Sequence, residues 1–290
     1  MYVPADQWEH LAWWEQYLLR IEAAAITSSS PKVFTLQSAA AIWGIPFFGM
    51  ENDVHVMAGN GAHGRLRAGI RTHRNRNLDD PVLQGNRWTT SRAQTVVELA
   101  VSAPFREAVA AADHVLKTDR DQGLAAMSKD AIFAVADRLD SRTKVGRVAR
   151  VIEIADARSG SPGESLSRAD MYLKGFPKPE LQYRVEAGNG SLIGISDFYW
   201  EDLRLLGEYD GSVKYSRNEY LKGRLPPDVL EMEKAREDSM RATGRGMVRW
   251  TWPNIWTPKK NPPATLSDKL TAAGLVADPT GNSWGLGKRG

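Results

Sequence analysis

Residues 191–215 place acidic side chains within apolar runs, and this limits the folds open to the chain more than any other feature. An unpaired carboxylate is costly to bury, so acids in such surroundings need a partner or a metal. Glu208 and Asp210 are two residues apart, so on a strand both side chains leave the same face. Asp197 ends the preceding apolar run, which we interpret as the neighbouring strand of a hairpin. The pattern predicts a sheet with three carboxylates facing one way.

Three carboxylates on adjacent strands suit a hard cation, because Mg²⁺ prefers oxygen ligands. Such an ion can polarise a phosphate and lower the pKa of a bound water, as phosphodiester hydrolysis requires. We therefore expect Asp197, Glu208 and Asp210 to hold Mg²⁺ or Mn²⁺. Lys214 follows shortly after, where its ammonium group would stabilise the negative charge that develops on the phosphate.

Composition excludes several other kinds of site. The chain has 290 residues and no cysteine, which excludes disulfides, thiolate zinc sites and a cysteine nucleophile. The last of the five histidines is His114, so chemistry in the C-terminal half must run without imidazole. The net charge of +3 permits nucleic-acid binding without demanding it. The acidic, aromatic start and the lack of a long apolar run predict no signal peptide, no membrane segment and a cytoplasmic location.

Hydrophobic spacing predicts a helix-rich first half with a small sheet. We expect helices at 6–27, 36–44, 91–101, 105–116, 128–137 and 144–154, and strands at 54–57, 69–73 and 87–89. The letters GNGAHG fit the spacing of a dinucleotide-binding loop, but a strand follows them where that loop would open a helix. We therefore predict a hairpin loop between the first two strands, and no nucleotide cofactor.

The second half predicts an α/β core in the order helix, three strands, helix, strand. We place helices at 161–174, 227–243 and 264–273, and strands at 182–185, 192–198, 203–209 and 247–252. The polar run at 156–161 separates two domains, 1–155 and 156–276. Residues 277–290 are expected to form a frayed tail.

A basic segment lies in the first half. Residues 65–76 hold five arginines and no acid: Arg65, Arg67, Arg71, Arg74 and Arg76. Such a segment can contact nucleic-acid phosphates. The alternative is a solvated strand face whose arginines pair with acids elsewhere in the chain.

Several motifs carry a family resemblance. The motifs SPGESLSR, ISDFYW, GEYDGSVKY, EKAREDSMRATG and MVRWTW, spread over residues 161–256, resemble the C-terminal domain of actinobacterial proteins of the AbiEi-like or DUF559 type. That domain is similar to very-short-patch-repair endonucleases of the PD-(D/E)XK nuclease-like superfamily. The first half resembles the AbiEi antitoxin-like part of these proteins through VFTLQSAAAIWGIPFF, VHVMAGN and TTSRAQTVVELA.

The resemblance implies a PD-(D/E)XK-like core with Asp197 and Glu208 as metal-binding acids and Glu164 as the acid of the first helix. The chain departs from the pattern of these relatives. Asp210 occupies the position where the superfamily signature has lysine, and Lys214 lies where many relatives carry histidine. The chain also begins where such relatives follow a winged-helix module, so we expect that module to be missing.

Glu164 has a second interpretation. Ser161, Pro162 and Glu164 fit a capping box, in which the glutamate would bond back to the Ser161 amide. Three functions also remain open. One is a Mg²⁺-dependent DNA endonuclease in phage defence or a toxin–antitoxin system. Another is a catalytically inert AbiEi-type antitoxin or regulator that binds a cognate toxin or DNA. The third is a phage or defence-island protein that binds another protein through its N-terminal domain.

Overall fold

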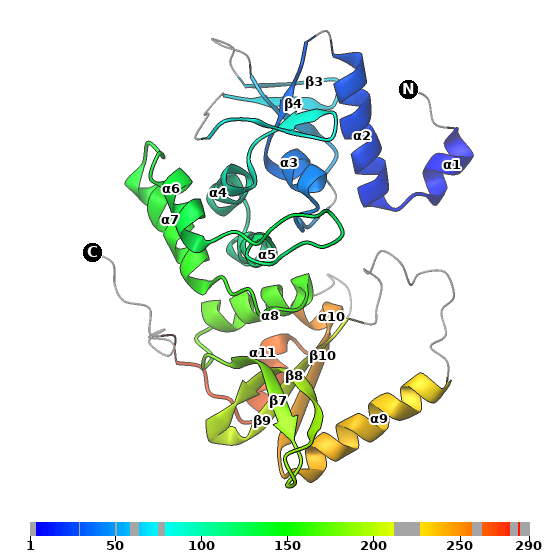
Figure 1. The fold of residues 1–290 in the computed structure, drawn as a ribbon, viewed down its shortest axis with the longest axis vertical. Coiled ribbons are helices and arrows are strands. Elements are labelled where there is room, and N and C mark those ends of the chain that lie inside the picture. Colours follow the sequence, from blue (N-terminus) through cyan, green and yellow to red (C-terminus); the bar gives the residue numbers. More distant parts are fainter. Residues whose placement is uncertain are drawn as a thin grey trace. The chain divides into compact units, whose positions relative to one another are not determined.

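The protein is represented by a computed structural model, which describes residues 4–28, 30–49, 51–58, 64–74, 79–211, 227–256, 263–278 and 284. The chain divides into two compact units, Met1–Ala157 and Arg158–Gly290. Helices and mixed sheets form both units (Figure 1), which confirms the predicted α/β class with a helical first half. No helix in the described ranges is long and apolar enough to cross a membrane.

The first unit combines a six-stranded sheet with seven helices in its described part. The helices are α1 (Ala5–His10), α2 (Trp13–Thr27), α3 (Leu36–Trp43), α4 (Arg92–Ser102), α5 (Phe105–Val115), α6 (Lys129–Ala136) and α7 (Arg142–Ile154). The strands are β1 (Val33–Phe34), β2 (Val54–Met57), β3 (Arg65–Arg67), β4 (Ile70–His73), β5 (Val82–Gln84) and β6 (Arg87–Thr89). Their order in the sheet is β3-β4-β2-β1-β6-β5, so β3 and β5 form its edges.

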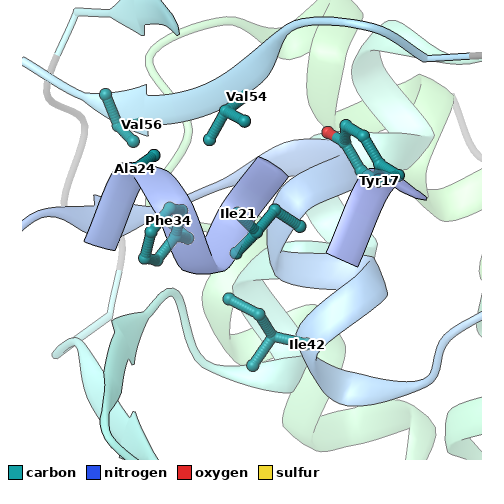
Figure 2. Close-up of a cluster of buried hydrophobic side chains, with 7 residues drawn as sticks. All are labelled: Tyr17, Ile21, Ala24, Phe34, Ile42, Val54 and Val56. Carbon is teal, nitrogen blue, oxygen red and sulfur yellow. The ribbon is translucent and has the colours of Figure 1, made fainter. Parts of the chain in front are cut away.

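The core of this sheet forms where α2 and α3 cover it. Figure 2 shows the cluster, in which α2 side chains meet residues of β1, β2 and α3; its members are Tyr17, Ile21, Ala24, Phe34, Ile42, Val54 and Val56. The Tyr17 hydroxyl is satisfied within the core, because it bonds Ser38 Oγ at 2.8 Å and donates to the Asp53 carbonyl at 3.0 Å. Burial of these apolar groups holds the short strands in place.

Two predictions about this unit were wrong. The predicted helix 6–27 is two helices, because the chain is extended at Leu11 and Ala12. Side chains of the second helix satisfy the break: Glu15 accepts from the Ala12 amide, and Gln16 donates to the Leu11 carbonyl. The strands 54–57 and 69–73 are not a hairpin either, since β2 and β4 pair in parallel and β3 intervenes.

The second unit contains a four-stranded sheet with helices on both faces. Its elements are α8 (Pro162–Leu173), β7 (Glu180–Glu186), β8 (Leu192–Trp200), the 3₁₀ helix η1 (Glu201–Leu203), β9 (Leu205–Asp210), α9 (Pro227–Ala242), β10 (Gly246–Thr251), α10 (Trp252–Ile255) and α11 (Leu266–Ala272). The order is β10-β9-β8-β7, with β10 parallel to β9 and the other pairs antiparallel. From α8 to β10, the helix, three strands, helix and strand follow the predicted order.

Consecutive residues of β10 show which helix covers which face of this sheet. The Trp250 indole donates to Ser167 Oγ of α8 at 2.8 Å, and the Arg249 guanidinium donates to Glu237 of α9 at 2.7 Å. Because neighbouring strand residues point to opposite faces, α8 and α9 lie on opposite sides. Trp250 packs under α8, whereas the face under α9 carries both the charged residues and an apolar cluster of Val185, Tyr199, Leu206 and Met240.

The prediction of a frayed tail was wrong where the structure describes the tail. Trp284 is buried, and its indole donates to the Phe176 carbonyl at 2.8 Å. The Asp278 amide also donates to the Gly175 carbonyl at 2.7 Å. A large aromatic side chain that finds both a pocket and an acceptor anchors a terminus.

Candidate functional site

The sheet register brings the candidate acids of the second unit together. Backbone pairing of β8 with β9 ends at Phe198 and Gly207, and the next residues of the two strands are Asp197 and Glu208. Arg236 of α9 stabilises the charged form of both carboxylates, so both lie near this helix. On the other neighbour, Arg249 of β10 pairs with Glu208, and Thr251 pairs with Asp210. A charged row therefore crosses three strands.

Polar side chains replace backbone pairing beyond Phe198. The Asp197 carboxylate accepts from the Tyr209 amide at 2.8 Å, and Ser196 Oγ donates to the Gly207 carbonyl at 3.0 Å. These bonds satisfy the Tyr209 amide and the Gly207 carbonyl, which would otherwise lack a hydrogen-bond partner at a sheet position close to the core. They also fix the position of the Asp197 carboxylate.

Glu164 reaches the same place from the N-terminus of α8. Ser161 Oγ accepts from the Glu164 amide at 3.2 Å, which forms the expected helix cap. The Glu164 carboxylate accepts from the Gly160 amide at 2.6 Å, one residue before the predicted Ser161. The same carboxylate accepts from the Gln182 side chain at 3.1 Å. Capping and a site role are therefore combined in one side chain.

Gln182, at the start of the predicted strand 182–185, links Glu164 to Asp197 and is a further residue of the site. Its amide bonds Glu164, and a bond from Gln182 also stabilises the Asp197 carboxylate. The backbone of Gln182 has a φ of 54°, in the left-handed region that non-glycine residues rarely adopt. Such a conformation costs about 1–3 kcal/mol and is often found where side-chain placement matters for function. No sequence signal marks it, because glutamine carries no preference for this conformation.

Asp197 has a strongly perturbed pKa. Burial and the nearby Glu164 carboxylate raise its pKa from 3.8 to about 7, although the Tyr209 amide, Arg236 and Gln182 favour the charged form. Burial is the larger cause, and the repulsion between two carboxylates that share a site adds to it. The Glu164–Asp197 pair therefore lacks sufficient positive charge.

Glu208 lies in a different charge environment. Its carboxylate is 3.4 Å from Arg236 Nη2 and 3.7 Å from Arg249 Nη2. Burial still raises the pKa of Glu208, so the two arginines offset its desolvation only in part. These contacts are longer than the 2.7–2.9 Å typical of charge-assisted hydrogen bonds. The pKa of the more exposed Arg249 is raised despite its own burial, since Glu237, Glu208 and Asp210 all stabilise its charge.

Arg249 lies between the acids that were expected to share a metal. Its Nη2 is 3.7 Å from Glu208 Oε2 and 3.7 Å from Asp210 Oδ2, while Nη1 donates to Glu237 Oε2 at 2.7 Å. Within the described part of the chain, no three histidine, aspartate or glutamate side chains meet as a metal site. A guanidinium in this position competes with a cation for Glu208 and Asp210.

The donor set that remains for a metal is Glu164 and Asp197. Mg²⁺ is often held by one or two protein carboxylates, with water and substrate phosphate as the other ligands. A repelling carboxylate pair fits that requirement, because a divalent cation would relieve the repulsion. Lys214 and Arg76 lie outside the described residues.

The predicted basic segment adopts a hairpin in the first unit. Arg65 and Arg67 are exposed on β3, and Arg74 is exposed after β4. Arg71 makes an ion pair with Asp53 at 2.6 Å. The structure therefore gives Arg71 the structural partner that the alternative interpretation required, and leaves the other three arginines facing solvent.

Comparisons with known proteins give one family. No family model matches the chain, and no solved structure matches it. Two Mycobacterium tuberculosis proteins, the uncharacterized protein Rv2248 of strain H37Rv and the uncharacterized protein MT2308 of strain CDC 1551, are each 31% identical over 192 residues. The match covers 66% of this chain and 67% of each relative. The chain belongs to the same protein family as these two mycobacterial proteins.

Proposed function

We propose that the second unit is a Mg²⁺- or Mn²⁺-dependent DNA endonuclease domain of the PD-(D/E)XK type. The observation that carries the proposal is the pair of Glu164 and Asp197, two carboxylates from different elements that Gln182 holds together. Burial, and then repulsion by Glu164, raise the pKa of Asp197. Perturbed titratable groups of this kind cluster at functional sites. The element order and the resemblance of residues 161–256 support the same reaction class.

The protein's own residues would divide the work in this site. Glu164 and Asp197 would hold the ion, which supplies Lewis-acid activation of the phosphate and of a bound water. Gln182 positions both carboxylates, and Glu208 lies beside them with Arg236 and Arg249 as its cations. Lys214 keeps its proposed role in stabilising phosphate charge. Action on cellular DNA would place the protein in the cytoplasm, in phage defence or a toxin–antitoxin system.

A cleavage assay tests the proposal. Supercoiled, linear and mismatched DNA would be incubated with the wild-type protein in Mg²⁺, Mn²⁺ or EDTA. Asp197→Asn removes the charge while an amide oxygen can still accept from the Tyr209 amide, and Asp202→Asn on η1 is the matched control because Asp202 is exposed. We expect metal-dependent cutting by the wild type and by Asp202→Asn, and none by Asp197→Asn. Cutting in EDTA, or by Asp197→Asn at the wild-type rate, would contradict the proposal.

Arg249 favours a second candidate function. Its guanidinium contacts Glu208, Asp210 and Glu237, so the acids nearest the predicted second position already have a cation. An inert scaffold that serves as an AbiEi-type antitoxin or regulator would retain such a network. In that case no DNA substrate is cut, and co-expression neutralises a toxin encoded beside the gene. Asp197→Asn would neutralise the toxin as well as the wild type does.

A further inference from the structure

The β3–β4 hairpin of the first unit is a regular two-stranded ribbon at the edge of the six-stranded sheet (Figure 1). Arg65 pairs with Thr72, and Arg67 pairs with Ile70. The two turn residues, Ala68 and Gly69, have φ values of 52° and 74°. Positive φ at both central residues is the hallmark of a tight turn whose twist matches that of the strands. The ribbon is therefore well defined even though β3 is solvent-exposed along its length.

The charges of this ribbon face solvent on one edge. Arg65 and Arg67 are separated by one residue, so their side chains lie on the same face of β3. In the described ranges of the chain, neither side chain makes an ion pair with an acid, and the same holds for Arg74. Asp53, the residue just before β2, is already held by Arg71 through two nitrogen donors at 2.6 and 3.0 Å. Three guanidinium groups are thus left for a polyanion.

We propose that the β3–β4 hairpin is a double-stranded DNA-binding ribbon, in which Arg65, Arg67 and Arg74 contact backbone phosphates. The B-form major groove admits a two-stranded β-ribbon, whereas the major groove of A-form RNA is too narrow for side chains to enter. Arginine is suited to the contact because its planar donors match the phosphate oxygens. The inference deepens the proposed function by naming the surface that holds the duplex, and DNA binding reports on it without cleavage.

A competing account assigns the arginines to edge protection. Charged side chains on an exposed edge strand prevent pairing with another chain. Charge of either sign provides this protection, whereas only positive charge attracts phosphate. Charge reversal therefore separates the two accounts: Arg65→Glu with Arg67→Glu keeps a charged edge and repels DNA.

The experiment measures binding of a fluorescent mixed-sequence DNA duplex to the full chain by anisotropy, in EDTA and over a series of salt concentrations. Variants are Arg65→Glu/Arg67→Glu, Arg65→Lys/Arg67→Lys and the control Arg71→Gln, whose side chain is held by Asp53. A duplex RNA of the same sequence is the second ligand. Circular dichroism and size-exclusion chromatography check folding and oligomeric state.

We expect the glutamate pair to weaken binding at least about tenfold and to lower the slope of log Kd against log salt by about 2, one unit for each lost phosphate contact. The lysine pair and Arg71→Gln should stay within about threefold of wild type, and duplex RNA should bind more weakly than DNA. Wild-type binding by the soluble glutamate pair would overturn the inference in favour of edge protection. Absence of duplex binding by the wild type would also overturn it. Arginine-dependent binding without metal-dependent cutting would instead defeat the nuclease proposal alone.

Discussion

The two ends of the acidic row in the second unit differ in how their charge is balanced. At one end, Glu208 and Asp210 lie beside Arg249, whose guanidinium also bonds Glu237. At the other end, Asp197 lies beside another carboxylate, Glu164, and burial and repulsion raise its pKa to about 7. One sheet face thus holds a neutralised acid cluster next to a repelling acid pair. A bound cation would therefore be stabilised more by the Glu164–Asp197 pair than by Glu208 and Asp210.

The first unit contains a pair of basic groups, two histidines, whose pKa values are lowered where that of Asp197 is raised. His55 Nδ1 lies 2.8 Å from His73 Nε2, and both imidazoles are at least partly buried. Burial and the neighbouring His55 lower the pKa of His73 to about 4. Burial also lowers the pKa of His55, despite the nearby Glu51. Because both pKa values are lowered, the two imidazoles are neutral near pH 7 and share a hydrogen bond, and repulsion arises only when they are protonated.

The largest expected change in stability comes from removing Arg249, the cation beside Glu208 and Asp210. Arg249→Met removes the 2.7 Å bond to Glu237 and one of the two cations that offset the burial of Glu208. Removing one partner of a buried charge pair leaves the other charge, here Glu208, insufficiently compensated. We therefore expect the free energy of unfolding to fall by about 3 kcal/mol. Urea denaturation at neutral pH measures it.

A matched arginine controls that measurement. Arg241→Met removes the other bond to Glu237, an exposed pair at 2.8 Å on one helix, and should cost no more than about 0.5 kcal/mol. Adding Glu208→Gln to Arg249→Met should restore part of the stability. Equal losses from the two arginines would show that Glu208 gains nothing from Arg249, and the contrast between the two ends would fail.

At the other end of the row, removing the charge of Asp197 should raise the free energy of unfolding. A group whose pKa is raised in the folded state stabilises the fold below its unfolded pKa, near 3.8, and this contribution is lost as pH rises through the folded value of about 7. Asp197→Asn avoids that loss. At pH 8 we expect the free energy of unfolding of the variant to exceed that of the wild type by on the order of 2 kcal/mol, because each pKa unit corresponds to about 1.4 kcal/mol.

Denaturation of wild type and Asp197→Asn at pH 4 and pH 8 checks this prediction. The difference between the proteins should shrink towards pH 4, where the wild-type aspartate is protonated in the folded state. Mg²⁺ should stabilise the wild type at pH 8 and leave the variant unchanged, since only the wild type keeps both carboxylates. A destabilised Asp197→Asn at pH 8 would mean that Arg236 and the Tyr209 amide outweigh the repulsion.

The sequence predicted the strands that carry these acids better than it predicted their partners. Period-two spacing placed Glu208 and Asp210 on one face, and the predicted strands 182–185 and 192–198 lie within β7 and β8, which pair antiparallel. Such signals are local, so they can be read from neighbouring residues. Arg249 lies far along the chain from Glu208 and reaches it only through the parallel pairing of β10 with β9. Long-range register of that kind leaves no trace in a short window.

The same limit explains Gln182 and the first-unit sheet. Gln182 joins two acids because a left-handed backbone turns its side chain towards them, and nothing in the residue type announces that conformation. The predicted strand 69–73 begins at Gly69, yet Ala68 and Gly69 make a tight turn and a further strand precedes it at Arg65–Arg67. Gly69 carried a turn signal, but Ala68 at positive φ gave none.

The histidine pair gives the next effect in size. A lowered pKa in the folded state means that the unfolded chain binds protons first, so stability is present above about pH 6.5 and is lost as pH falls towards the folded value of about 4. His73 is partly exposed, so solvent screening reduces the effect to on the order of 1 kcal/mol. His73→Gln should remove most of this loss between pH 7 and pH 5. Thermal unfolding across that range measures it, and an unchanged pH dependence would exclude the pair as its source.

The smallest expected change in stability is the most direct test of the repelling pair. Glu164→Gln keeps an oxygen that can accept from the Gly160 amide, so at pH 4, where Asp197 is protonated in the folded state, the free energy of unfolding should change by no more than about 0.5 kcal/mol. The charge next to Asp197 disappears, however, and the pKa of Asp197 should fall below its wild-type value of about 7. NMR titration of the Asp197 carboxyl carbon in the two proteins measures the shift. Asp170→Asn, on the same helix and beside Lys174, is the control and should leave that titration unchanged. If the pKa of Asp197 stays near 7 in Glu164→Gln, burial alone raises it, and the two ends of the row differ in solvation rather than in charge balance.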